Sequence, residues 1–212
     1  MEAVILNYTK KNRNTNSSTD DKIKKMSTLL SALDGGNIST VYILYSDKDS
    51  AIADFSTKKQ NYKFSIIPIK LDNSIDELGV LSKVNYLVNE RKIKNDLLII
   101  VENPELNSDF SNVLDYFEAT KKPIILLKVA YKNFISKNNE VILDKSGFVK
   151  TIVEHPVNPK SKITSAGVYF IPKDALFWIK KIANTGANKT SFDFFIKRLS
   201  QKRKVRGIIN KW

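Results

Sequence analysis

The run Leu97-Leu98-Ile99-Ile100-Val101 decides the fold of this chain. All five residues are apolar, so neither face of the segment carries a charged or polar side chain. A strand with one solvated face alternates apolar and polar side chains, whereas a strand covered on both faces is apolar throughout. The run therefore predicts a strand at the centre of a parallel sheet with helices on both sides.

Apolar segments of similar kind lie on both sides of this run, with helical patterns between them. Further strands are expected at 3–6, 41–45, 64–69 and 123–129, with Pro68 placing one of them at a sheet edge or strand end. Helical spacing of apolar residues predicts helices over 26–33, 74–90 and 110–117, and the polar stretch from 7 to 25 is expected to be a loop. Strands that alternate with helices predict an α/β domain with right-handed crossovers.

The last third of the chain has a different pattern. Segments 140–144 and 148–153 flank Lys145-Ser146-Gly147, which predicts a hairpin whose glycine takes a positive φ. A strand is expected over 167–172 and another over 205–209, with helices over 174–182 and from Ser191 onward. No repeat or linker divides the sequence. We expect a single domain over 1–212 in which the C-terminal third packs onto the first sheet as a lobe.

Composition excludes several classes of protein. The 212 residues include no cysteine, which excludes a disulfide scaffold and any thiolate metal site, and one histidine, His155. No apolar stretch approaches the roughly 20 residues that span a bilayer, so a cytoplasmic protein without a membrane partner is expected. The 35 Lys and Arg outnumber the 22 Asp and Glu, giving a net charge of +13. That charge favours polyanions without choosing among them.

The order of several motifs is more specific than any one of them. Leu98-Ile99-Ile100-Val101-Glu102-Asn103 precedes Asp144-Lys145-Ser146-Gly147-Phe148-Val149, which leads to Val153-Glu154-His155-Pro156 and then to Ser165-Ala166-Gly167-Val168-Tyr169. This succession resembles the sugar-phosphate nucleotidyltransferases, the group that contains glucose-1-phosphate thymidylyltransferase and mannose-1-phosphate guanylyltransferase. The resemblance covers almost the whole chain and is strongest over 140–171, where the family has D-x-x-G-x-V, E-K-P and N-x-G-I-Y.

The resemblance implies a Rossmann-like three-layer nucleotidyltransferase fold with a mixed, mostly parallel central sheet. It further implies a nucleotide-binding half over 1–135 and a sugar-binding lobe over 136–212. Members of the family join a nucleoside triphosphate to a sugar 1-phosphate with the help of a divalent metal such as Mg²⁺. The implied ligands are thus a nucleotide or a sugar nucleotide, and phosphoryl transfer of this kind needs cations, backbone N–H groups and metal-binding carboxylates.

The residues that align with the family's phosphate loop depart from its pattern. The family has G-x-G-T-R, and the aligned stretch Asn7–Arg13 contains no glycine. Arg13 falls on the motif's arginine, and Lys24 or Lys25 stands for a later lysine, so these three are the implied catalytic cations. Gly79, in Leu78-Gly79, resembles the glycine that lets a nucleobase approach.

The position of the metal ligand is the second departure. The family's strand ends in G-D-N, and its Asp binds the metal. An ungapped alignment places Asn103 on that Asp and Asp109 on a later acidic position, whereas a slip of one residue places Glu102 there. Asn is a poor ligand for a hard cation beside a carboxylate. The implied metal ligands are Glu102 and Asp109, with Asn103 near the nucleotide.

The implied sugar-phosphate site lies in the second half. Glu154 matches the family's Glu, which holds sugar hydroxyls, while His155 replaces the Lys that meets the sugar phosphate. Ser165 replaces an Asn and keeps a hydroxyl that can form hydrogen bonds.

These departures favour a nucleotidyltransferase-like protein whose catalysis is weakened or lost. An alternative is a non-catalytic protein that binds a nucleotide or sugar nucleotide and regulates or scaffolds, as a homo-oligomer or with an active homologue. A third interpretation is a nucleic-acid-binding protein that uses the basic stretch 197–206.

Overall fold

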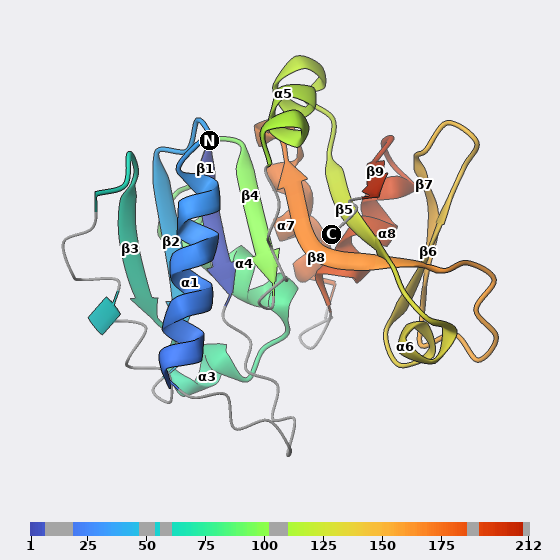
Figure 1. Cartoon of the computed structure of the whole chain (residues 1–212), viewed down its shortest axis with the longest axis horizontal. Coiled ribbons are helices and arrows are strands. Elements are labelled where there is room, and N and C mark those ends of the chain that lie inside the picture. The colour runs from blue at the N-terminus through green and yellow to red at the C-terminus, as the bar shows by residue number, and fades with distance from the viewer. Residues whose placement is uncertain (7–18, 47–53, 56–60, 102–109, 186–190, 210–212) are drawn as a thin grey trace.

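The fold is built on one seven-stranded sheet, seen in a computed structural model of the chain (Figure 1). The structure describes residues 1–6, 19–46, 54–55, 61–101, 110–185 and 191–209. The strands follow the order β3-β2-β1-β4-β8-β5-β9. Their bounds are β1 Glu2–Leu6, β2 Thr40–Tyr45, β3 Ser65–Lys70, β4 Leu97–Val101, β5 Ile124–Val129, β8 Ile163–Ile171 and β9 Arg206–Ile209.

Strand directions confirm the mixed, mostly parallel sheet. Strand β8 runs antiparallel to both of its neighbours, β4 and β5, and every other pairing in the sheet is parallel. The apolar run at 97–101 is strand β4, which lies between β1 and β8 with four of its five residues fully buried. Pro68 lies in the edge strand β3, as predicted.

Helices cover both faces of the sheet and complete the three layers. Alternate strand residues face opposite sides: Ile100 contacts the layer of α1 and α5, and Ile99 contacts the layer of α4, α7 and α8 (Figure 1). The bounds of the helices are α1 Thr19–Leu33, α3 Asn73–Asp76, α4 Val80–Glu90, α5 Ser111–Thr120, α6 Lys132–Ser136, α7 Leu176–Ala183 and α8 Phe192–Ser200. None of these described helices is long and apolar enough to cross a membrane.

Two helix boundaries differ from the prediction. Helix α1 begins at Thr19, so the expected loop over 7–25 is wrong for its last seven residues. The first turns of α1 are polar because they face solvent, with Asp20 and Asp21 at the N-terminus where acidic side chains are favourable. The helix expected over 74–90 is two helices, since the chain leaves helical geometry before Gly79, whose backbone is extended at φ −67° and ψ 162°.

The C-terminal third joins the main sheet more closely than a packed lobe would. Strand β8 lies in the middle of the sheet and β9 at its edge, so the expected packing of this third onto the first sheet is wrong for these two strands. The hairpin of β6 (Asn139–Leu143) and β7 (Val149–Glu154) forms a separate two-stranded sheet. Its turn contains Gly147 at φ 78°, as predicted. The division into halves at 135 stays a prediction.

Candidate functional site

The carboxyl ends of β1, β2 and β4 form one rim of the sheet. Leu6 pairs with both Leu44 and Val101, so these three strands end side by side. In open α/β sheets, ligands bind beyond this edge. The segments that follow β1 and β4 carry the predicted residues Arg13, Glu102, Asn103 and Asp109, all of which lie outside the described residues. Their roles stay predictions.

The predicted cations Lys24 and Lys25 lie on α1. Both side chains are exposed, and the carbonyl of Lys24 accepts a hydrogen bond from the Thr28 hydroxyl, Oγ1, at 3.0 Å. The expectation that they belong to a loop is wrong, because the helix already includes them. Their positions are therefore fixed by α1 rather than by the segment 7–18.

Gly79 lies at the start of α4, where the sequence placed it. Its carbonyl accepts hydrogen bonds from the backbone N–H groups of Ser82 and Lys83, at 3.0 and 3.1 Å. The glycine is thus the N-cap of the helix. A contact between Gly79 and a nucleobase stays a prediction.

Lys83 is a buried cation at the rim that the sequence analysis missed. Its side chain is only 4% exposed, and its Nζ lies 2.8 Å from Oδ1 of Asp76, which is 40% exposed. Both line a cavity of about 10 Å³ with Leu6 and Leu44, at the ends of β1 and β2. Val80 and Leu87 share its helix face, so a lysine among apolar positions was the signal in the sequence.

On the other side of β4, a distortion of β8 turns Ser165 and Tyr169 toward each other. Gly167 has φ 76°, and a Cβ atom there would lie 2.3 Å from the carbonyl oxygen of Val101, so only glycine fits. The Ser165 hydroxyl accepts a hydrogen bond from the Gly167 N–H at 3.1 Å and lies 3.0 Å from the Tyr169 hydroxyl. The sequence identified Ser165 but not its partner.

Asp193 is the buried centre of this group. It lies in the first turn of α8 and is 7% exposed. The Tyr169 hydroxyl donates to its Oδ1 at 2.7 Å, and Nδ2 of Asn139 donates to its Oδ2 at 2.5 Å. Because Tyr169 gives its single proton to Asp193, the Ser165 hydroxyl is the donor toward Tyr169. Four side chains from β6, β8 and α8 thereby form one hydrogen-bonded network.

The pKa of Asp193 reflects this burial. Loss of hydration raises the pKa of the carboxyl group above its ordinary value, and the negative charge of Glu154 raises it further. The hydrogen bonds from Asn139 and Tyr169 lower the pKa, and the nearby Ser165 hydroxyl adds to their effect. An acid in the first turn of a helix is usually a solvated partner of the helix dipole, and no pattern in the sequence indicates that this one is buried.

Glu154 and His155 lie beside the network at the end of β7. Glu154 pairs with Asn139 across the hairpin, so it lies close to the network through Asn139. His155 is exposed, and its backbone takes φ 45°, in the left-handed region, with its N–H donating to the Asn138 carbonyl at 2.9 Å. Non-glycine residues in this region are uncommon, and such strain gathers at functional sites.

Comparison with known proteins shows the fold of the whole chain. The chain is similar to a Bacillus anthracis protein described as a glucose-1-phosphate thymidylyltransferase, whose structure was solved in complex with a sucrose. The match covers 100% of this chain and 87% of the Bacillus anthracis chain, with a TM-score of 0.79 and 14% sequence identity. This chain has the sugar nucleotidyltransferase fold. A UDP-glucose pyrophosphorylase complexed with UDP-glucose matches 99% of this chain and 91% of its own, with a TM-score of 0.74 and 10% identity. No protein-family model and no curated protein sequence matches.

Within the sugar nucleotidyltransferase fold, the predicted residues fall into three groups. Glu154 and Ser165 gather around Asp193, with His155 next in the chain to Glu154. Gly79, together with the unpredicted Lys83, lies at the carboxyl ends of β1 and β2. Lys24 and Lys25 lie apart on α1, and the phosphate-loop and metal residues are outside the described part of the chain.

The described residues do not supply a metal site. Over the ranges that the structure describes, no three Asp, Glu or His side chains gather as ligands for a cation. The expected Mg²⁺ ligands Glu102 and Asp109 lie outside those ranges. We therefore assign no chemical step to a metal.

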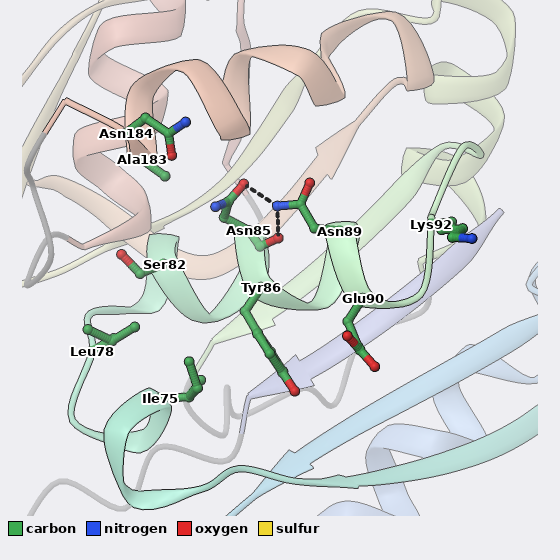
Figure 2. A pocket seen from close by; sticks show the side chains of 10 residues that line it. All are labelled: Ile75, Leu78, Ser82, Asn85, Tyr86, Asn89, Glu90, Lys92, Ala183 and Asn184. Atoms are coloured by element: carbon green, nitrogen blue, oxygen red, sulfur yellow. Dashed lines mark hydrogen bonds between the residues drawn. The ribbon is translucent and has the colours of Figure 1, made fainter.

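A separate groove lies along α4, on the helical face of this fold (Figure 2). It has a volume of about 550 Å³. Figure 2 shows Ser82, Asn85 and Asn89 pointing from α4 toward Asn184 at the end of α7. Asn89 donates to the Asn85 side chain at 3.1 Å. No predicted site residue lines this groove, so it is distinct from the network around Asp193.

Proposed function

We propose that this chain binds a sugar nucleotide or a nucleoside triphosphate in the manner of a sugar nucleotidyltransferase, with weakened or lost transfer activity. The observation that carries the proposal is the buried network of Asp193, Tyr169, Asn139 and Ser165. It brings two of the residues implied to hold the sugar, Glu154 and Ser165, to one place in a chain whose whole length has the matching fold.

The network gives Ser165 a fixed orientation. Asp193 accepts from Tyr169, and Tyr169 accepts from Ser165, so the Ser165 proton points inward and its remaining lone pair is available to accept. One sugar hydroxyl would donate to this oxygen, and a second would donate to the exposed carboxylate of Glu154. Because the partners of Ser165 are already ordered, binding costs little additional conformational entropy.

The two halves of the site would hold different parts of the ligand. Lys83 would lie at the nucleotide side, where a phosphate oxygen would share its ammonium group with the Asp76 carboxylate, 2.8 Å from Nζ. His155 lies at the sugar side and would meet the sugar phosphate, with its left-handed backbone fixing the direction of the chain before Pro156.

Weakened transfer follows from the sequence of the two segments outside the described residues. The phosphate loop has no glycine between residues 7 and 13, so the backbone has less freedom to approach a triphosphate. Asn103 stands where the family has its metal carboxylate. Transfer depends on neutralising phosphate charge, and both changes remove part of that capacity.

Isothermal titration tests binding, and a pyrophosphate-release assay tests transfer. UDP-glucose, dTDP-glucose and the nucleoside triphosphates are titrated with and without Mg²⁺. We expect binding of at least one ligand, loss of affinity in Ser165→Ala, and no loss in the control Ser136→Ala, whose hydroxyl bonds only the Lys132 carbonyl of α6. Absence of any binding would overturn the proposal, and rapid turnover would overturn the weakened transfer.

The alternative is a non-catalytic role in regulation, with a second copy or an active homologue as partner. It is separated from weak catalysis by the same two assays. Binding that is indifferent to Mg²⁺ and occurs without pyrophosphate release would support the non-catalytic role. Size-exclusion chromatography with light scattering then tests self-association.

A further inference from the structure

A second charged site lies at the opposite end of the sheet, around the ring of Phe148. Lys122 Nζ, Lys204 Nζ and the guanidinium carbon of Arg206 lie 5.3, 5.2 and 5.5 Å from the ring centroid. The same guanidinium carbon lies 5.8 Å from the centre of the Tyr116 ring. Two aromatic rings thus gather three cations, a group that we call the Phe148 cluster.

The backbone fixes the Phe148 cluster rigidly. Arg206 lies at the start of β9, where its N–H donates to the Pro123 carbonyl at 2.8 Å, and the next N–H, from Gly207, donates to the Gly147 carbonyl at 3.0 Å. Its guanidinium donates to the Ser146 carbonyl and packs directly on Gly147, where an added Cβ would lie 2.8 Å from Nη1. Segments far apart in the sequence are therefore held together.

The cluster is at the amino end of the parallel strands, away from the proposed nucleotide site. Figure 1 shows α5 and the turn of the β6–β7 hairpin at the end of the molecule where the N-terminus lies, while α3 and α6 lie at the other end. Lys122 precedes β5 and Arg206 begins β9, so both lie at the starts of parallel strands. A ligand bound at the Phe148 cluster would therefore not block the proposed nucleotide site at the rim that contains Lys83 and Gly79.

The charge of the cluster is not balanced within the described part of the chain. None of Lys122, Lys204 and Arg206 has an ion pair with a carboxylate among those residues, whereas the nearby Lys121 pairs with Asp96 and Glu118. Within the predicted basic stretch, Arg203 is also paired, with Asp174 at 3.0 Å. Three cations gathered around one ring repel one another, and bound anionic groups relieve that repulsion.

We propose that the Phe148 cluster binds the phosphate backbone of nucleic acid without sequence preference. Arg206 offers a planar fork that matches a phosphate, and Lys122 and Lys204 add point charges. Phe148 is already contacted by three cations, so a stacked base is not the expected ligand. Backbone phosphates bind by charge alone, and the +13 net charge extends the attraction beyond the cluster.

Fluorescence anisotropy with a mixed-sequence labelled single strand and a duplex, over 50–200 mM salt, tests this proposal. The variant Lys122→Gln/Lys204→Gln/Arg206→Gln should lower the affinity for DNA at least about tenfold at the lowest salt concentration. It should also reduce the slope of log affinity against log salt concentration by about 2 to 3. The control Lys63→Gln/Arg91→Gln/Lys94→Gln removes the same charges from exposed positions elsewhere and should change the slope much less.

Three results would overturn the proposal: no binding by the wild type, an equal loss in the control, or competition by polyglutamate as effective as that by DNA of equal charge. The variant Phe148→Leu keeps every charge and should weaken binding less than the triple variant does. Circular dichroism confirms folding of each variant. Titration with the sugar nucleotide should be unchanged in the triple variant, so a failure here is separate from a failure of the proposed function.

Discussion

Asp193 and Arg206 both lie in the last quarter of the chain, and they hold their charges in opposite surroundings. Asp193 is 7% exposed and has donors on both carboxyl oxygens, from Asn139 and Tyr169. Arg206 is half-buried against Gly147 and Phe148, and its described contacts are a carbonyl and two rings rather than a carboxylate. One charge is satisfied inside the protein, and the other is left for a ligand.

The difference indicates which property of the protein each of the two groups affects. A buried acid without partners costs several kcal/mol, so the structure around it must be complete before any ligand arrives. The cations of the Phe148 cluster have no carboxylate partner among the described residues, and their mutual repulsion is relieved only when an anion binds. The Asp193 network is therefore expected to affect stability and orientation, whereas the Phe148 cluster is expected to affect association and its dependence on salt.

The largest expected effect is that of Asp193→Ala. It removes the carboxylate that accepts from Nδ2 of Asn139 and from the hydroxyl of Tyr169, which should lower the free energy of unfolding by about 2–5 kcal/mol. Urea denaturation measures it. The control Asp174→Ala removes an exposed partner of Arg203 and should cost far less. Equal losses in the two variants would remove the distinction between the two regions.

Tyr169→Phe removes one link of the network and leaves the ring in place. Asp193 loses a donor and Ser165 loses its acceptor, so the unfolding free energy should fall by about 1–3 kcal/mol. Sugar-nucleotide affinity should fall with it, because Ser165 is no longer oriented. Unchanged affinity, measured by titration, would mean that the network stabilises the fold without serving the site.

The pH dependence of stability sharpens the comparison further. The folded pKa of Asp193 is raised, so its contribution is fully present below the ordinary Asp pKa of about 3.9 and is lost as pH rises through the folded value. The isosteric Asp193→Asn has no such titration. The wild-type unfolding free energy minus that of this variant should therefore decrease from pH 4 upward. A difference that increases with pH would contradict the assignment.

Lys83→Met separates ligand binding from stability at the rim. The apolar side chain suits the helix face, and the carboxylate left behind, Asp76, is 40% exposed and can be hydrated, so the loss of stability should be modest. Nucleoside triphosphate affinity should fall about tenfold, or ~1.4 kcal/mol. The control Lys94→Met removes an exposed charge and should leave the affinity unchanged. Equal affinities in all three proteins would place the nucleotide elsewhere.

The smallest expected effect is that of His155→Gly on stability. Glycine takes φ 45° without the steric penalty, but it also adds freedom to the unfolded chain, so the net gain should stay below about 1 kcal/mol. His155→Ala lacks this relief. Both should weaken binding of the sugar phosphate. If neither does, the His155 side chain has no part in binding the sugar phosphate.

Most of the fold was predictable because its strands are apolar runs. The apolar runs predicted burial on both faces, which holds for Leu97 to Ile100 and for Ile124 to Leu127, and Gly147 predicted its turn. The start of α1 at Thr19 was not predictable from periodicity, since its first turns face solvent and have no apolar stripe. The position of β8 in the sheet depends on its pairing with β4 and β5, which lie much earlier in the chain. Local sequence patterns do not indicate such long-range pairing.

The site was predictable only where a family motif marked it. Glu154 and Ser165 were identified, and the network joins them, but Asn139, Tyr169 and Asp193 were missed. Those three come together from β6, β8 and α8, so no spacing in the sequence links them. Lys83 was also missed, although its position on an apolar helix face is visible in the sequence.

The position of β8 has a consequence for biosynthesis. Strands β4 and β5 are neighbours in the order of translation, yet each pairs with β8, which leaves the ribosome later, and neither pairs with the other. A nascent chain that ends before Ile163 would expose one edge of β4 and lack the strand that joins β5 to the rest. We expect such truncations to remain open and prone to aggregation until the missing strand is supplied.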